Sequence, residues 1–366
     1  MSKQLNPIFT TTLALVEQYK SALTTPPTTT ETAKDPEVLP RLAACTTALR
    51  AYVTKLSLLA ITSPFTHSAI TKVLRDLNES VLPSLVATAL VITPAQYTKA
   101  FHSEILSLVR GVLTEFLSLV REVQRVDGKK EQEKKDAVKE GELTKSEKDV
   151  VTVATGRVWD ACDVVTDVSQ KGVVGFVMRK VEQWRDLVRD AVEEIEEWDP
   201  EDDDDFMDEL LDEDDEEGEK GEEKEDDEDD DPEETAALHK HKKLTLRFLK
   251  PLAQVYPAVL NNRLKKAGDA PLTSAASIEK LESLMANLQA IPDHVDEAAG
   301  GLYEADFERS AGYLQKTRES AVKAVNLVIS PWGAAEDAPA DKFNTWSKMW
   351  LKVVEDMSKE IGEKIE

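Results

Sequence analysis

The sequence contains few of the residues that build metal centres or disulfide frameworks. Only two of its 366 residues are cysteine, Cys45 and Cys162, and neither has a cysteine or histidine partner nearby in the sequence. This count excludes a disulfide framework and a structural zinc site. Two thiols in so long a chain are typical of small buried side chains in a reducing compartment.

Long apolar stretches are also missing. No run of apolar residues approaches the roughly 18 that are needed to span a bilayer. Residues 1–12 do not combine a basic region with an apolar block, as a signal peptide would. We therefore expect a soluble, intracellular protein without membrane contact.

Glycine is scarce, and this scarcity favours helices over a turn-rich β fold. There are 14 glycines, and the first of them is Gly111. Apolar residues recur at intervals of three and four, which is the spacing of one helix face. The most regular stripe, hereafter the seam, consists of Val174, Val177, Val181, Trp184, Val188, Ile195 and Trp198. A stripe this regular is expected to pack lengthwise against another helix, either inside its own bundle or in a partner.

The periodicity and the helix-boundary residues together predict ten helices. They span residues 5–22, 37–61, 65–91, 94–126, 147–167, 172–198, 234–266, 274–298, 302–329 and 340–364. Thr93 with Gln96 and Thr144 with Glu147 have the spacing of a capping box, which marks a helix start. Pro83 predicts a kink or a break in the third helix. Residues 127–146, rich in Lys and Glu, either extend the preceding helix or stay disordered.

The charge is concentrated in one segment. The net charge is −26, and residues 199–234 contain 26 acidic and two basic side chains, so the rest of the chain is nearly neutral. A nearly neutral body has no surplus of Lys and Arg for binding nucleic acid. The acidic run is interpreted as a self-repelling linker, with the binding of basic proteins such as histones as the alternative.

These patterns predict an all-α fold, with two helical bundles joined by a long acidic disordered linker. The expected divisions are an N-terminal helical bundle over 1–200, the linker over 201–232 and a C-terminal four-helix bundle over 233–366. In the last helix, an apolar stripe is expected to be bundle core, or a partner groove if it is exposed. It consists of Phe343, Trp346, Met349, Trp350, Val353, Met357 and Ile361.

No motif for chemistry is present. The sequence lacks a glycine-rich phosphate loop, a His-Glu-x-x-His metal motif and a Gly-x-Ser-x-Gly nucleophile turn. His239 and His241 are two residues apart, so on a helix they point in nearly opposite directions and cannot share a metal. Cys162 is expected to be a packing residue rather than a reactive thiol. We predict no catalytic residues, no metal, no cofactor and no small-molecule substrate.

Three segments carry a resemblance to a known family. Residues 156–163 read GRVWDACD, residues 184–197 read WRDLVRDAVEEIEE before Asp199-Pro200, and residues 108–111 read LVRG. Together, with the segment at 108–111 upstream of the other two, they resemble the cyclin-D-binding protein family, the GCIP-like helix-loop-helix proteins. The clear match covers about 90 residues in the middle of the chain. No residue in these segments performs chemistry.

The resemblance implies an all-α interaction protein of the nucleus and cytoplasm. It implies partners such as D-type cyclins, and a role in restraining cell-cycle progression or transcription. Members of the family are described as helix-loop-helix proteins without a basic region, and no basic segment precedes residues 147–198 here. We predict that helices 147–198 bind the partner, with the seam residues as candidates. The alternative is an acidic histone-chaperone-like or chromatin-associated factor acting through residues 199–234.

Overall fold

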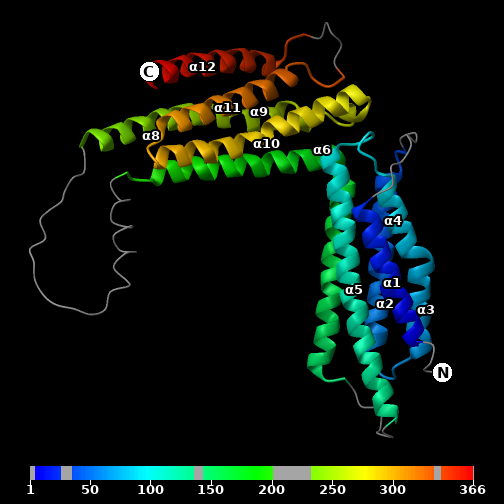
Figure 1. Ribbon diagram of the computed structural model, residues 1–366. Helices are drawn as coiled ribbons and strands as arrows, with labels where there is room; N and C mark the ends of the chain where they lie inside the picture. Colours follow the sequence, from blue (N-terminus) through cyan, green and yellow to red (C-terminus); the bar gives the residue numbers. More distant parts are fainter. Residues whose placement is uncertain (1–4, 26–34, 136–142, 201–231, 334–338, 366) are drawn as a thin grey trace, which may run out of the picture. The chain divides into compact units, whose positions relative to one another are not determined.

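The computed structural model describes residues 5–25, 35–135, 143–200, 232–333 and 339–365. Within these ranges the regular structure is helical throughout, which confirms the all-α prediction. The chain forms two compact units, Met1–Phe176 and Val177–Glu366 (Figure 1). Among the described residues, no helix has the length and apolarity that a membrane span requires.

The first unit is a bundle of long helices. Its elements are α1 (Leu5–Thr24), α2 (Val38–Ile61), α3 (His67–Asp76), α4 (Leu82–Val91), α5 (Lys99–Lys135) and the first part of α6 (Lys145–Glu197). Helix α1 packs against α5 and α3, and α2 packs against α4 (Figure 1). Phe9, Leu42, Leu74 and Phe116 are fully buried among them, because the three-four spacing turns one apolar face of each helix inward.

The predicted interruption of the third helix is present at Pro83. Residues Leu77–Val81 form a π-helical turn, and α4 begins directly after it with Pro83 in its first turn. Proline has no backbone N–H and its ring crowds the carbonyl one turn earlier, so a widened turn accommodates it. The single helix expected over 65–91 is therefore divided into α3, the π turn and α4.

The predicted start of the fourth helix at Thr93-Pro94 is wrong. Residues 93–97 form a turn, and α5 begins at Lys99. The Thr98 hydroxyl accepts a hydrogen bond from the Phe101 N–H at 3.1 Å. Ile92 and Tyr97 are buried on either side of the turn, so the packing of these two side chains prevailed over the local capping signal.

The two helices expected over 147–167 and 172–198 are present, and they meet at a break at Gly172; the label α6 covers both of them. Gly172 has φ 64° and ψ −168°, a conformation that is essentially restricted to glycine. The helix starts as predicted: the Thr144 N–H donates to Glu147 at 2.8 Å, and the Glu147 N–H donates back to the Thr144 hydroxyl at 3.3 Å. This reciprocal pair confirms the capping box.

The division into units differs from the predicted domain boundaries, because it falls between Phe176 and Val177 rather than after residue 200. Contacts near the end of α6 explain this. The Trp198 ring meets the Tyr303 ring edge-on at a centroid distance of 4.8 Å. Lys242 donates to the carbonyl oxygen of Glu196 at 3.0 Å. The predicted linker lies outside the described residues, apart from Pro232.

The second unit contains the rest of α6 and five further helices. These are α8 (Pro232–Ala253), α9 (Val255–Asn262), α10 (Ala275–Tyr303), α11 (Phe307–Leu327) and α12 (Lys342–Ile365). Short 3₁₀ turns at Leu264–Lys266 and Ala270–Leu272 connect α9 to α10. The single helix expected over 234–266 is wrong, since α8 ends two residues after Pro251.

Helices α10 and α11 form the closest pair of this unit. A Cβ atom at Gly301 would lie 2.8 Å from the backbone nitrogen of Ser310, so only glycine permits this approach. The Ser310 hydroxyl donates to the Ala298 carbonyl at 2.8 Å across the same junction. Tyr256 of α9 is fully buried and donates its hydroxyl to the Leu288 carbonyl at 2.9 Å.

Candidate interaction surface

The seam predicted for partner binding is mostly buried. Val177, Val181, Val188 and Ile195 are at most 1% exposed. Trp184 is 9% exposed, and Val174 and Trp198 are half-buried. The first of the two alternatives, packing within the protein's own core, is therefore what the structure shows. A role of these residues in partner binding stays a prediction.

The first half of α6 presents a different apolar stripe to solvent. Val150, Val153 and Val164 are 37%, 59% and 44% exposed, and Arg157 and Asp160 between them are also exposed. The five residues follow a 3-4-3-4 spacing, so they share one side of the helix. We name this side the valine face: Val150, Val153, Arg157, Asp160 and Val164.

The opposite side of the same half anchors α6 in the first unit. Val151, Ala154, Val158, Cys162 and Val165 are all at most 1% exposed. The helix therefore has valines on two sides, although one buried side is enough to hold it in a bundle. Valine is also a poorer helix former than alanine or leucine, because its branched side chain loses rotamer freedom in a helix. Exposed valines here are explained neither by core packing nor by helix propensity.

The N-terminal end of the valine face is held in place by charge. Glu147, which closes the capping box, also accepts a hydrogen bond from Lys129 of α5 at 2.6 Å. These bonds from Lys129 and Thr144 lower the pKa of Glu147 to about 2, so its carboxylate is charged at neutral pH. An open hollow lies beside this end, lined by Lys145, Ser146, Asp149, Val150, Val153 and Arg157.

Further ion pairs hold the middle of this half against α5 and α2. Arg157 lies 3.3 Å from the carboxylate of Glu115 in α5. Arg50 of α2 forms an ion pair with Asp163, and its guanidinium lies 5.4 Å from the centre of the Trp159 ring. The exposed valines therefore lie on a helix that ion pairs connect to both α5 and α2. A rigid apolar stripe with charged residues inside it is a suitable surface for a partner helix or groove.

Sequence reasoning missed the valine face because it followed the most regular stripe. The stripe with the strictest spacing lies in the second half of α6 and is core. The sequence signal for the valine face is the excess of valine over residues 150–165, which places this residue type on both sides of one helix.

The described residues contain no site for chemistry that we can identify. Within the described ranges, no three His, Cys, Asp or Glu side chains lie close enough together to hold a metal ion. The His241 ring stacks on Phe307 at 3.8 Å, and burial lowers the pKa of this histidine. Cys162 is buried, and desolvation together with the nearby Asp163 raises its thiol pKa to about 12. A protonated, enclosed thiol is a packing residue, as predicted.

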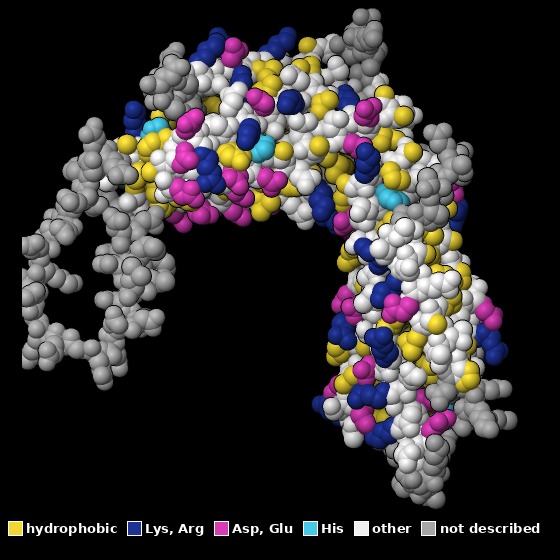
Figure 2. Space-filling model, in the orientation of Figure 1, with side chains coloured by type: hydrophobic (Ala, Val, Ile, Leu, Met, Phe, Trp, Pro, Cys, Tyr) yellow, Lys and Arg dark blue, Asp and Glu magenta, His cyan; other side chains and the backbone are white. Residues whose placement is uncertain are grey.

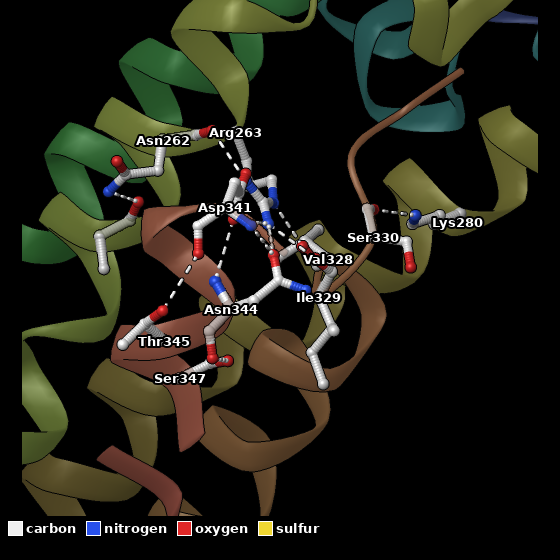
Figure 3. A network of polar contacts seen from close by, with 11 residues as sticks. Asn262, Arg263, Lys280, Val328, Ile329, Ser330, Asp341, Asn344, Thr345 and Ser347 are labelled. Atoms are coloured by element: carbon white, nitrogen blue, oxygen red, sulfur yellow. Dashed lines mark hydrogen bonds and ion pairs between the residues drawn. The ribbon is translucent and has the colours of Figure 1, made fainter. Parts of the chain in front are cut away.

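The second unit contains a buried arginine in a dense polar network. The side chain of Arg263 is 1% exposed and forms an ion pair with Asp341 at 2.6 Å. Figure 3 shows the guanidinium surrounded by acceptors from two other segments. It donates to the carbonyl oxygens of Val328 and Ile329, at the end of α11, and to the Asn344 side chain near the start of α12.

This network joins helix ends and leaves no donor for a ligand. Asp341 accepts the Asn344 N–H at 3.0 Å, so it caps α12 while it neutralises Arg263. All the N–H groups of the guanidinium point at carbonyl or carboxylate acceptors, and its carbon lies 4.2 Å from the centre of the Phe343 ring. Arg263 and its hydrogen bond lower the pKa of Asp341, which keeps the pair ionised. The network is a structural clamp between α9, α11 and α12.

The apolar stripe predicted for the last helix is divided between two environments. Phe343 and Trp350 are 1% and 6% exposed, as expected of core. Met349 and Val353 are 61% and 45% exposed, so the prediction that the whole stripe is core is wrong. The buried side of α12 consists of Phe343, Ser347, Trp350 and Val354. Because the neighbouring helices cover only this side, the apolar residues on the other side of α12 remain exposed.

The comparison with protein families identifies one region of the chain. The family described as Grap2 and cyclin-D-interacting, N-terminal, matches residues 41–201. This match contains the segments at 108–111, 156–163 and 184–197, and it confirms the resemblance. The matched range runs from the first turn of α2 to the end of α6, and it therefore contains the whole valine face. No curated protein matches the chain.

Proposed function

We propose that this chain, which belongs through residues 41–201 to the Grap2 and cyclin-D-interacting family, is a non-enzymatic protein that binds a partner through the valine face. The observation that supports this most directly is the exposure of three valines on a helix whose opposite side is core. The valine face lies inside the matched region, and exposed apolar side chains gathered on one side of a helix are a feature of protein-binding surfaces.

The partner that we propose is a D-type cyclin or a protein of similar helical surface. The support for it is the family description, which names cyclin D and Grap2 as what its members interact with. Binding of this kind would act on cell-cycle progression or transcription, and it would take place in the nucleus and the cytoplasm. These finer points come from the family resemblance, whereas the surface itself comes from the structure.

The chemistry of the valine face suits a partner with an apolar groove. Val150, Val153 and Val164 would supply the buried contact, and side chains spaced in this way along a helix enter a groove as a row. Arg157 and Asp160 lie between them and have opposite charges, so they would fix the register rather than add much affinity. Because the helix is already held by the bundle, little conformational entropy is lost on binding.

A single substitution tests the proposal. Val153 is the most exposed of the three valines, so Val153→Asp should leave folding intact and weaken binding to a purified D-type cyclin by about tenfold or more. The matched control is Leu58→Asp, since Leu58 lies in α2 of the same unit and is 56% exposed. Calorimetry with each variant gives the affinity, and thermal melts confirm that both remain folded.

Two results would contradict the proposal. Equal loss of binding in both variants would mean that added charge, rather than the valine face, disturbs the complex. Unchanged binding by Val153→Asp, with normal binding by the wild type, would move the contact to another surface. In that case the seam, exposed by opening of the unit, becomes the next surface to test.

A second candidate function follows from the charge of residues 199–234. Its 26 acidic side chains favour the binding of basic proteins such as histones. Deleting residues 201–231 should abolish histone binding under this proposal, while Val153→Asp should not affect it. A deletion variant that binds histones as the wild type does would exclude the candidate.

A further inference from the structure

We propose that the exposed apolar side of α12 is a docking site for residues 206–211 of the same chain. This surface, hereafter the α12 face, consists of Trp346, Met349 and Val353 with the neighbouring lysines Lys348 and Lys352. Trp346, Met349 and Val353 follow a three-four spacing, and Met349 and Val353 are 61% and 45% exposed. An apolar stripe of this regularity on a surface helix is a site for another apolar segment.

The charges around the α12 face favour an acidic occupant. From Lys342 to Val354 the helix contains three lysines and no acidic residue. Lys348 and Lys352 are exposed, and the structure records no ion pair for either of them within the described residues. Figure 2 shows hydrophobic, Lys or Arg, and Asp or Glu side chains interspersed on this unit's visible face, so the absence of acidic residues is local to this part of α12. A partner with apolar residues set among carboxylates would satisfy both features of the α12 face.

The chain itself contains such a segment. Over residues 201–217, thirteen of the seventeen side chains are acidic, and the other four are Phe206, Met207, Leu210 and Leu211. In a helical conformation these four would share one side, because they lie at positions i, i+1, i+4 and i+5. An acidic run that served only as a solubilising spacer would need no such cluster of large apolar residues. This cluster and the α12 face are complementary in both apolarity and charge.

The connection to the second unit makes the contact sterically accessible. Pro232 begins α8, which packs against α12, and the Trp350 indole donates to the Pro251 carbonyl of α8 at 2.8 Å. Twenty residues separate Leu211 from Pro232, and such a chain can extend over about 65–70 Å. Helix α12 is only about 36 Å long. A tether of this length also keeps the local concentration of the segment high, so weak contacts are enough for docking.

The test uses methyl NMR of the full chain with labelled methionines, since Met349 lies in the α12 face and Met207 in the segment. Phe206→Ser/Leu210→Ser/Leu211→Ser removes the apolar cluster and retains every acidic residue. We expect the Met349 methyl resonance to shift in this variant, and a synthetic peptide of residues 201–214 to restore its wild-type position. Leu187→Ser is the control, because Leu187 is 55% exposed and lies in α6.

A second pair of variants tests the lysines. Lys348→Glu/Lys352→Glu in the triple-serine background should weaken binding of the peptide by about fivefold or more, since two attractive charges become repulsive. Lys265→Glu/Lys266→Glu reverses two exposed lysines elsewhere in the unit and should leave the affinity unchanged. An identical Met349 resonance in wild type and triple-serine variant, with no response to the peptide, would overturn the proposal. A Met349 shift that depends on protein concentration would also overturn it, because the occupant would then be a second copy.

Discussion

The two halves of α6 both contain valines at helical spacing but lie in different environments. Before Gly172 the helix buries one side and leaves the valine face in water, whereas after Val177 its regular seam is buried. Both halves contain valines spaced by three and four. The difference shows that periodicity identifies which residues share a side of a helix, but the neighbouring elements decide whether that side is covered.

The largest effect on folding is expected when the second half of α6 is removed from its unit. A fragment of residues 233–366 lacks Val177, Val181, Trp184, Val188 and Ile195, all of which are buried. Burying each such side chain stabilises a fold by about 1.5–3 kcal/mol. The loss exceeds the 5 kcal/mol or so at the lower end of domain stability, so we expect no cooperative melt.

The control for this experiment is the fragment 177–366, which should melt cooperatively in circular dichroism. An equally sharp transition for 233–366 would mean that the second unit folds without α6. The domain boundaries first predicted from the sequence would then describe the folding units better than the packing does.

Single substitutions in the two halves should differ strongly. Trp184→Ala leaves a cavity in the buried seam and should cost about 3–5 kcal/mol of unfolding free energy. Val153→Ala removes a side chain that is 59% exposed and should change the unfolding free energy by less than about 0.5 kcal/mol. Denaturant titration of both variants measures the difference, and similar values for the two would contradict the assignment of core and surface.

The junction between the halves depends on one glycine. Gly172→Ala forces a side chain into a backbone conformation at φ 64° and ψ −168°, and should cost about 1–3 kcal/mol. Gly156→Ala is the matched control, because a Cβ atom there meets nothing within 4 Å and the helix is regular. It should stabilise the protein by about 0.5–1 kcal/mol. If Gly172→Ala had the higher melting temperature of the two variants, the backbone at position 172 would accept a side chain without strain, and the prediction would be wrong.

The smallest expected effect concerns the start of the exposed half. The pKa of Glu147 is lowered to about 2, so its contribution to stability is complete above the ordinary glutamate pKa and is lost as the pH falls toward 2. Glu147→Gln should therefore lower the unfolding free energy by about 0.5–1 kcal/mol at neutral pH. The difference from wild type should vanish near pH 2 in parallel denaturant titrations. A difference that is independent of pH would assign the effect to the side-chain shape rather than the charge.

Much of the secondary structure follows from local signals. The capping box of Thr144 and Glu147 and the disturbance at Pro83 are each encoded within a few residues, and the structure contains both. The Thr93 signal failed because the burial of Ile92 and Tyr97 depends on other helices. Local capping contributes about 1 kcal/mol, which is less than two buried apolar side chains contribute.

The sequence by itself determined that the chain is helical, which residues share each helix side, and which family its middle region resembles. Only the tertiary structure decided that the seam is core, that the valine face and the α12 face are exposed, and that the unit boundary lies inside α6. The physical reason is the range of the interactions. Helix formation depends on residues within one or two turns, whereas burial depends on contacts between segments far apart in the chain, which spacing alone does not specify.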